Sequence, residues 1–196
     1  MELREALRRR RMVRAFDPRP VPPEVVERVL WAASRAPSAG YTQGNEFLVL
    51  DQPESVSRFL DLTVEQEYRA LFEKPPPVVV LPLAHKRAYL DRYSEPDKAG
   101  TGMDREEEWP VPYWDVDAPM AAMAMLLAAV DEGLGGWFFG LFRGEREMLR
   151  AFGVPEEYRP IGVVVLGYPA ADGGERGSAS TRRRRAFDEL IHRNGW

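Results

Sequence analysis

Cysteine is absent from this chain of 196 residues, and histidine occurs only twice, at His85 and His192. Without cysteine the chain has no disulfide, no iron–sulfur cluster, no thiolate zinc site and no thiolate nucleophile. The two histidines and the carboxylates show no spacing typical of a metal site or a hydrolytic triad. We therefore expect no metal ion, and any chemistry must use other groups.

Long apolar runs are also missing. The most apolar stretch covers residues 118–130, whereas a membrane span needs roughly twenty residues. The N-terminus is charged from Glu2 onward and does not resemble a secretory signal. We expect residues 118–130 to form a buried helix, with Asp117 as its N-cap, and we expect a cytoplasmic protein without a membrane partner.

A general basic surface is lacking too, because the net charge is -4 and the pI is about 5.4. Arginines nevertheless cluster at residues 8–11, at Arg14 and at residues 182–185. The guanidinium group of arginine can donate two hydrogen bonds to two oxygens of one phosphate, so these clusters indicate a local anion site. If the two ends of the chain meet in the fold, both clusters would bind one phosphorylated ligand. The alternative is that they are solvated termini. The acidic balance argues against a nucleic-acid partner.

With 44% apolar residues, the chain suffices for one buried core, and we expect a single domain over residues 1–196. Helices and strands alternate without internal repeats, which indicates an α+β or α/β sandwich. Helices are predicted over residues 2–10, from Pro23 to about residue 36, after Pro53, over 118–130, over 145–152 and from Phe187; strands are predicted over 47–50, 78–83 and 161–166.

Residues 84–117 are predicted to form an irregular insertion. They mix charge, glycine and proline with Tyr89, Tyr93, Trp109, Tyr113 and Trp114. One interpretation is a lid whose aromatic rings select planar ligands, and the other is a long loop that packs onto a partner subunit.

Five segments, in this order along the chain, resemble the FMN-dependent nitroreductase family. They are Arg10-Arg11-Met12-Val13-Arg14-Ala15-Phe16, Ala36-Pro37-Ser38-Ala39-Gly40, Gly133 to Gly140, Tyr158 to Pro169, and Arg184-Arg185-Ala186-Phe187-Asp188-Glu189. The resemblance covers most of the chain apart from residues 51–117. It implies an α+β fold with a mixed sheet flanked by helices, assembled as an intertwined homodimer with FMN at the subunit interface.

The resemblance also implies a cofactor site. It places Arg10 near the FMN phosphate with Arg182 and Arg184, and it places Arg14 near the pyrimidine edge of the flavin ring. A loop of the partner subunit would contact the ring, and residues after Trp137 would lie along its other face. The implied cofactor-binding residues are Arg10, Arg11, Met12, Arg14, Pro37, Ser38, Ala39, Gly40, Tyr41, Gln43, Phe139, Gly140, Leu141, Arg182 and Arg184; the implied substrate pocket comprises Tyr41, Trp109, Tyr113, Trp114 and Phe138.

Two departures from the family pattern stand out. Met12 replaces the usual serine, and Tyr41, Gly44 and Asn45 stand where the family usually has Asn, Pro and Trp, although Gln43 is retained. The flavin site is expected to survive, because the arginines remain. The substrate pocket is expected to differ, because Tyr41 is larger than asparagine.

The implied function is an FMN-dependent NAD(P)H oxidoreductase that reduces a small electron-poor acceptor, such as a nitroaromatic or a quinone, by a ping-pong mechanism. No dinucleotide-binding fingerprint is present, so nicotinamide would bind by stacking on the flavin. The alternatives are a flavin storage protein without turnover, or another chemistry of the family such as dehalogenation or flavin fragmentation.

Overall fold

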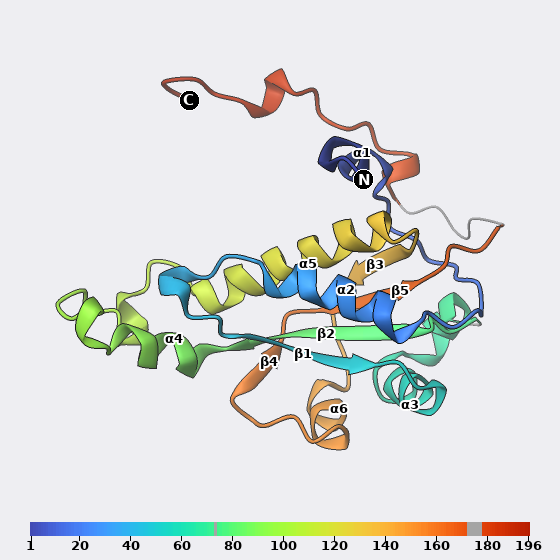
Figure 1. Cartoon of the computed structure of the whole chain (residues 1–196), viewed down its shortest axis with the longest axis horizontal. Coiled ribbons are helices and arrows are strands. Elements are labelled where there is room, and N and C mark those ends of the chain that lie inside the picture. The colour runs from blue at the N-terminus through green and yellow to red at the C-terminus, as the bar shows by residue number, and fades with distance from the viewer. Residues whose placement is uncertain (73, 172–177) are drawn as a thin grey trace.

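The computed structural model describes residues 1–72, 74–171 and 178–196. Its centre is a sheet in the order β1 (Asn45–Leu50), β2 (Val78–His85), β5 (Val163–Gly167) and β3 (Gly135–Phe139), with β4 (Tyr158–Pro160) paired to the end of β2 (Figure 1). These strands pair antiparallel, and Met12 adds an isolated parallel bridge to Gly136 at the outer edge of β3. The predicted last strand, residues 161–166, corresponds to β5, and the short strand β4 directly precedes it along the chain.

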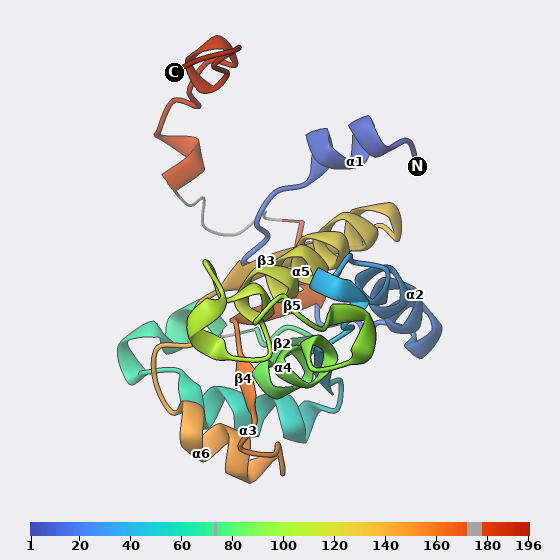
Figure 2. The same cartoon turned by 90° about the vertical axis from the view of Figure 1, so that its left-hand side faces the viewer.

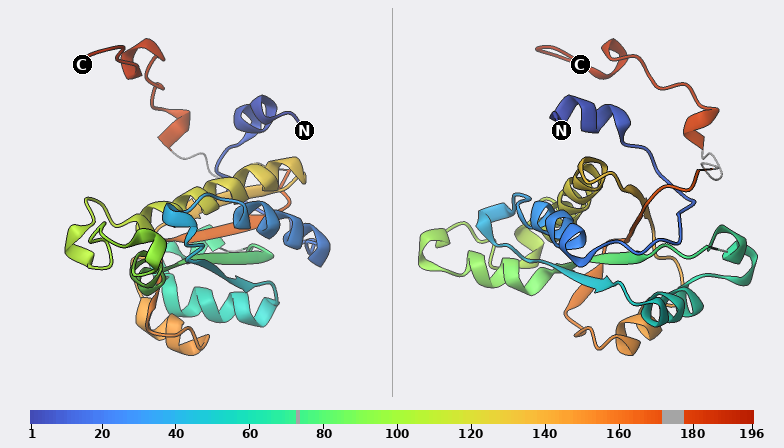
Figure 3. Two further views of the ribbon diagram at one scale, coloured as in Figure 1. Left: turned by 60° about the vertical axis from the view of Figure 1, so that its left-hand side comes forward. Right: turned by 45° about the vertical axis from the view of Figure 1, so that its right-hand side comes forward.

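Helices cover both faces of the sheet. On one face lie α2 (Pro23–Ser34) and α5 (Tyr113–Asp131), and on the other lie α3 (Pro53–Thr63) and α6 (Glu145–Ala151), as Figure 3 shows. The predicted α+β fold class is therefore confirmed. So are the predicted helices that begin near Pro23, Pro53 and Glu145.

Burial on both faces explains why β2 and β5 read as unbroken apolar runs. Successive side chains of a strand point to opposite faces. Val78 and Val80 therefore pack with α2 and α5, whereas Val79 and Leu81 pack with α3 and α6. The two cores share one sheet, and β3 at its edge contributes side chains to both.

The central helix α5 begins five residues earlier than the sequence predicted. It covers 19 residues from Tyr113 and includes Asp117 in its interior, so the prediction that Asp117 caps the helix is wrong. Packing of Trp114 in an aromatic cluster extends the helix backward, and Pro119 is accommodated inside it. By length and composition α5 could cross a membrane, but it packs on α2 and on the sheet as a core helix does.

The segment 84–117 is more regular than predicted. It contains α4 (Lys86–Tyr93), two single turns of 3-10 helix (Pro96–Lys98 and Glu106–Glu108) and the start of α5. Its buried rings, Tyr89, Trp109 and Trp114, form a third cluster with Ala84 and Ala118. The segment therefore packs onto its own chain through this cluster.

The two ends of the chain differ in how they pack. Helix α1 (Leu3–Arg9), as predicted, lies at the end of α5, where the Met1 amino group pairs with Asp131. The predicted C-terminal helix is wrong: only a 3-10 turn, Asp188–Leu190, is present, and Phe187 is 76% exposed. Figure 2 shows residues 178–196 standing apart from α1, and Phe187, Leu190 and Ile191 are all exposed. The described part of the chain therefore does not bury the apolar side chains that would stabilise a helix there.

Candidate functional site

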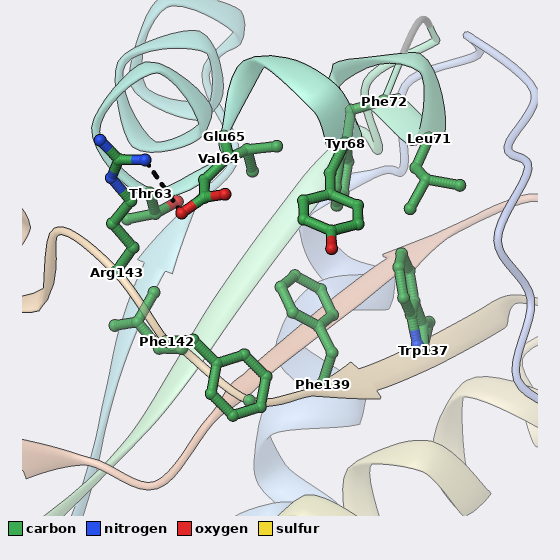
Figure 4. Close-up of a pocket in the computed structure, with 12 residues that line it drawn as sticks. Thr63, Val64, Glu65, Tyr68, Leu71, Phe72, Trp137, Phe139, Phe142 and Arg143 are labelled. Carbon is green, nitrogen blue, oxygen red and sulfur yellow. Dashed lines mark ion pairs between the residues drawn. The ribbon is translucent and has the colours of Figure 1, made fainter.

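A cavity of about 490 Å³ opens on the α3–α6 side of the sheet. Its walls are the end of α3, the 3-10 helix η2 (Gln66–Phe72) and the connection from β3 to α6 (Figure 4). Three of the predicted cofactor-binding residues, Phe139, Gly140 and Leu141, line it. The other lining residues are Thr63, Val64, Glu65, Tyr68, Leu71, Phe72, Trp137, Phe142 and Arg143.

Aromatic rings form most of the cavity wall. Alternation along β3 places Trp137 and Phe139 on one face of the sheet, with their ring centroids 4.6 Å apart. Phe72 from η2 stacks on Trp137 at 5.7 Å with an interplanar angle of 18°. Figure 4 shows the ring of Tyr68 above Phe139, with its hydroxyl directed between Phe139 and Trp137. Such a cavity favours a planar aromatic ligand, because stacking and apolar burial both stabilise it.

Two arginines stand at the cavity. Arg143 pairs with Glu65 at 2.9 Å on the rim. The guanidinium of Arg14 lies over the ring of Trp137, 5.1 Å from its centroid, and donates a 3.5 Å hydrogen bond to the Met12 carbonyl. Arg14 therefore provides a positive charge beside the aromatic wall, although it does not itself line the cavity.

The segment that carries Arg14 is fixed to the edge of β3. The Val13 N–H donates to the Gly136 carbonyl at 3.0 Å, and the Phe138 N–H lies 3.5 Å from the sulfur of Met12, which accepts it. A Cβ on Gly135 would lie 2.7 Å from Val13, so this close approach requires glycine. Met12 thus makes a contact of its own in place of the missing serine hydroxyl.

Phe138 points away from the cavity. It belongs to the opposite face of β3, where it packs against the core under α2 and α5. A Cβ on Gly162 would lie 2.7 Å from its ring. Within one chain, Phe138 is therefore a core residue on the side of the sheet away from Phe139.

Several of the clustered arginines are already paired within the chain. Arg8 and Arg9 both pair with Glu5, and Arg183 and Arg185 both pair with Glu189. The predicted phosphate ligands differ: in the part of the chain that the structure describes, no ion pair is formed by Arg10, Arg11, Arg182 or Arg184. One chain also does not bring the two clusters together, because the C-terminal segment stands apart from α1 in Figure 2.

The predicted ring-contacting loop, which contains Pro37, Ser38, Ala39, Gly40, Tyr41 and Gln43, has a defined conformation. Residues Ala39–Tyr41 form a 3-10 turn, the Ser38 hydroxyl accepts the Gln43 N–H at 2.8 Å, and Tyr41 is 72% exposed. The Ala39 N–H donates to Asp117, near the start of α5.

The loop and the arginine segment lie at opposite ends of α5. The loop is bonded to Asp117, whereas α1 is paired to Asp131 and Val13 is bonded to Gly136, just beyond the helix. The helix rises about 21 Å between Asp117 and Asp131 at 1.5 Å per residue. Figure 1 shows the loop and the arginine segment at opposite ends of this helix. The two halves of the predicted flavin site are therefore apart within one chain.

The predicted substrate-pocket rings lie at the loop end of α5. Trp109 is 8% exposed, stacks edge-on against Tyr93 at 4.7 Å and donates from its indole nitrogen to the Met103 carbonyl at 2.7 Å. Trp114 is equally buried, whereas Tyr113 is 36% exposed. Of these three rings, Tyr113 is the one that the fold presents to the surface.

Sequence reasoning missed the cavity residues contributed by η2 and by the β3–α6 connection. Tyr68, Leu71 and Phe72 lie in the stretch that the family resemblance leaves out, and Trp137 directly precedes the residues that the resemblance places along the flavin ring. A usable signal was present: Trp137 and Phe139 are two residues apart in a strand and must share a face. Among the described residues, no group of three His, Asp or Glu side chains could hold a metal ion.

Comparison with known proteins finds relatives in both sequence and structure. A protein of Methanothermobacter thermautotrophicus, provisionally named as an NADH dehydrogenase/NAD(P)H nitroreductase, is 27% identical over 179 residues, 90% of this chain and 82% of that protein. An FMN-dependent nitroreductase of Clostridium difficile R20291 superposes with a TM-score of 0.70 at 20% identity, over 97% of this chain and 98% of its own.

A second solved structure, of a provisionally named nitroreductase from Desulfovibrio desulfuricans in complex with FMN, superposes with a TM-score of 0.73 at 22% identity, over 100% of this chain and 98% of its own. At these identities the two superpositions show a common fold. Residues 7–168 match the Nitroreductase family, and this stretch contains the arginine segment at residues 10–16, the loop and every residue that lines the cavity. The chain therefore belongs to the nitroreductase family.

Proposed function

We propose that this chain is an FMN-dependent NAD(P)H oxidoreductase that works as a cytoplasmic homodimer and reduces a small electron-poor acceptor, of nitroaromatic or quinone type, by a ping-pong mechanism. The observation that carries the proposal is the aromatic cavity with Arg14 at its edge. FMN, when bound, would supply hydride and electron transfer at its N5 atom.

The residues present fit FMN in three respects. The wall formed by Phe72, Trp137 and Phe139 suits a planar ring system. Arg14 can compensate negative charge on the pyrimidine edge of that ring. Arg10, Arg11, Arg182 and Arg184, which form no ion pair with described residues, remain available for a phosphate, to which each charged hydrogen bond contributes about 1.5–3 kcal/mol.

The separation along α5 supports a homodimer. Because Asp117 holds the loop at one end and Gly136 holds the arginine segment at the other, one chain cannot supply both halves of a site around one flavin. A second copy, with its loop facing the cavity, would complete the site. The exposed apolar side chains at the C-terminus, Phe187 and Leu190, would then find a surface to cover them.

The chain's own residues would act mainly by position and charge. Arg14 would stabilise the anionic form of the reduced ring, while the aromatic wall would hold the ring and exclude water. Gly140 and Leu141 directly follow β3, and the phenyl ring of Phe142 sits where a Cβ on Gly140 would go.

An anaerobic absorption spectrum tests the function. The protein is saturated with FMN, freed of excess flavin, and recorded before and after addition of NADH or NADPH. We expect retained flavin that bleaches, followed by recovery of the oxidised spectrum when a quinone is added. Retained flavin that stays yellow would instead indicate storage, and failure to retain flavin would contradict the proposal.

Substitution of Arg14 tests the placement of the ring. Arg14→Gln should weaken FMN binding by about tenfold or more, the equivalent of one charged hydrogen bond, and should lower the midpoint potential of the bound flavin. Arg19→Gln is the matched control, because Arg19 also covers an aromatic ring, that of Tyr168 at 3.4 Å, outside the cavity. Equal effects of the two substitutions would count against a specific role of Arg14.

A further inference from the structure

Asp117 is the one charged side chain that is buried among the residues that the structure describes, with 2% of its surface exposed. Burying a carboxylate is costly unless strong donors satisfy it. One oxygen of Asp117 accepts two hydrogen bonds of 2.8 Å, from the Ala39 N–H and from the Tyr89 hydroxyl. No arginine, lysine or histidine pairs with it in the described ranges. Its partners are therefore a loop amide and a phenol.

The loop that Asp117 holds is strained. Tyr41 and Gln43 both have φ of 55°, a left-handed conformation that is unfavourable for side chains of their kind, and Gly40 between Ala39 and Tyr41 has φ of 62°. Such conformations persist where the surroundings over-determine them, and they cluster at functional sites. Tyr41 and Gln43 are two of the three non-glycine residues with positive φ in the described chain.

Helix α4 completes the support of the loop. Arg92 donates to the Gly40 carbonyl at 3.0 Å and is itself held by Asp97 at 2.6 Å. The ring of Tyr93 occupies the place of a Cβ on Gly40, and the ring of Tyr89 occupies that of a Cβ on Gly44. Burial and the hydrogen bond to Asp117 raise the pKa of Tyr89, so its hydroxyl remains a donor. These contacts fix the backbone of a loop whose Tyr41 side chain is largely exposed.

We infer that Asp117 is a positioning residue, which acts through the Ala39 amide and Tyr89 to hold residues 38–43 so that Tyr41 covers the flavin cavity of the partner subunit and limits which acceptors enter. The inference rests on the proposed function for the target of Tyr41. The link between Asp117 and the loop stands on the hydrogen bonds alone.

Amide hydrogen exchange tests the link without any cofactor. Asp117→Ala and Tyr89→Phe should each raise the exchange rate of peptides covering residues 38–44, by about tenfold or more for Asp117→Ala. Asp117→Asn, which keeps an acceptor oxygen, should restore most of the protection. Asp115→Asn is the matched control, because Asp115 lies on the same helix and pairs with Arg159 at 2.7 Å. If exchange in Asp117→Ala and in Tyr89→Phe equalled exchange in the Asp115→Asn control, the inference would be overturned.

A double-mutant cycle tests the route through Tyr41 in the FMN-loaded protein. Asp117→Ala and Tyr41→Ala should each change the KM for a quinone such as menadione severalfold, and the double variant should match Tyr41→Ala alone, because the first substitution acts through the second residue. Additive effects would show that Asp117 acts by another route and would overturn this step. If wild-type protein shows no turnover with NADH or NADPH, the proposed function fails, whereas the exchange experiment still decides whether Asp117 positions the loop.

Discussion

Gly144 joins the cavity rim to helix α6, and its replacement by alanine makes a sharp test of the structure. Its φ is 67°, and a Cβ there would lie 1.9 Å from the carbonyl oxygen of Leu62 and 2.9 Å from its carbonyl carbon. The obstacle is backbone at the end of α3, so it cannot rotate away as a side chain could. Because Arg143 and Thr63 line the cavity on either side of this contact, any shift there changes the cavity.

Gly153 supplies the matched control. It lies beyond the other end of α6 with φ of 66°, and a Cβ there would meet nothing within 4 Å. Gly153→Ala should therefore lose only the left-handed conformational preference, about 1–2 kcal/mol. Gly144→Ala should lose that amount and the cost of moving α6 away from α3, for a total of about 3–5 kcal/mol.

Urea unfolding of the two variants measures the difference directly, with the slope checked for a change in the denatured state. Binding of FMN, followed by quenching of its fluorescence, should weaken in Gly144→Ala and stay unchanged in Gly153→Ala. If both variants lost the same stability, the close packing of residue 144 on Leu62 would be refuted.

Three further substitutions probe helix α5 and its contacts. Arg28 donates hydrogen bonds to both carboxylate oxygens of Glu132, at 2.8 and 2.7 Å, and thereby lowers the pKa of Glu132 below its usual 4.5. The pair therefore stabilises the fold above pH 4.5, and this stabilisation is lost as the pH falls through the lowered pKa. Arg28→Gln should slightly lower the thermal midpoint at pH 7, and the difference from wild type should disappear as the pH falls through the lowered pKa of Glu132. Met125 is fully buried, so Met125→Ala should lower the free energy of unfolding by about 2–5 kcal/mol at any protein concentration. Met123 lies on the same helix with 38% of its surface exposed, so Met123→Ala should leave the protomer stable. If this exposed face of α5 lies in the dimer interface, the substitution should make the thermal midpoint depend more strongly on protein concentration.

The sequence was most informative where local signals and burial agree. Proline at the start of α2 and α3, and the unbroken apolar run of β2, predicted these elements because each pattern reflects a local backbone or burial requirement. Asp117 misled the prediction of α5 for a physical reason. An aspartate before an apolar run is a good N-cap by local rules, but here the carboxylate serves Ala39 and Tyr89, which are distant in sequence.

The candidate site was predictable only in part for the same reason. The arginine segment and residues 139–141 form continuous motifs that can be recognised along the chain. The wall contributed by Tyr68 and Phe72 depends on where η2 crosses β3, a relation that no local pattern encodes. The apolar residues from Phe187 onward are spaced as in an amphipathic helix, yet they are exposed in the single chain. Local propensity therefore predicted an α-helix where the structure has only a 3-10 turn.

The separation of loop and arginine segment along α5 has a genetic consequence. If each site takes its arginines from one protomer and its loop from the other, a protomer with a defective Arg14 and a protomer with a defective Tyr41 damage different halves. A mixed dimer of the two then carries one site with both defects and one site with neither. An impaired Arg14 variant and an impaired Tyr41 variant, refolded together, should therefore complement each other, whereas two variants of the same segment should not.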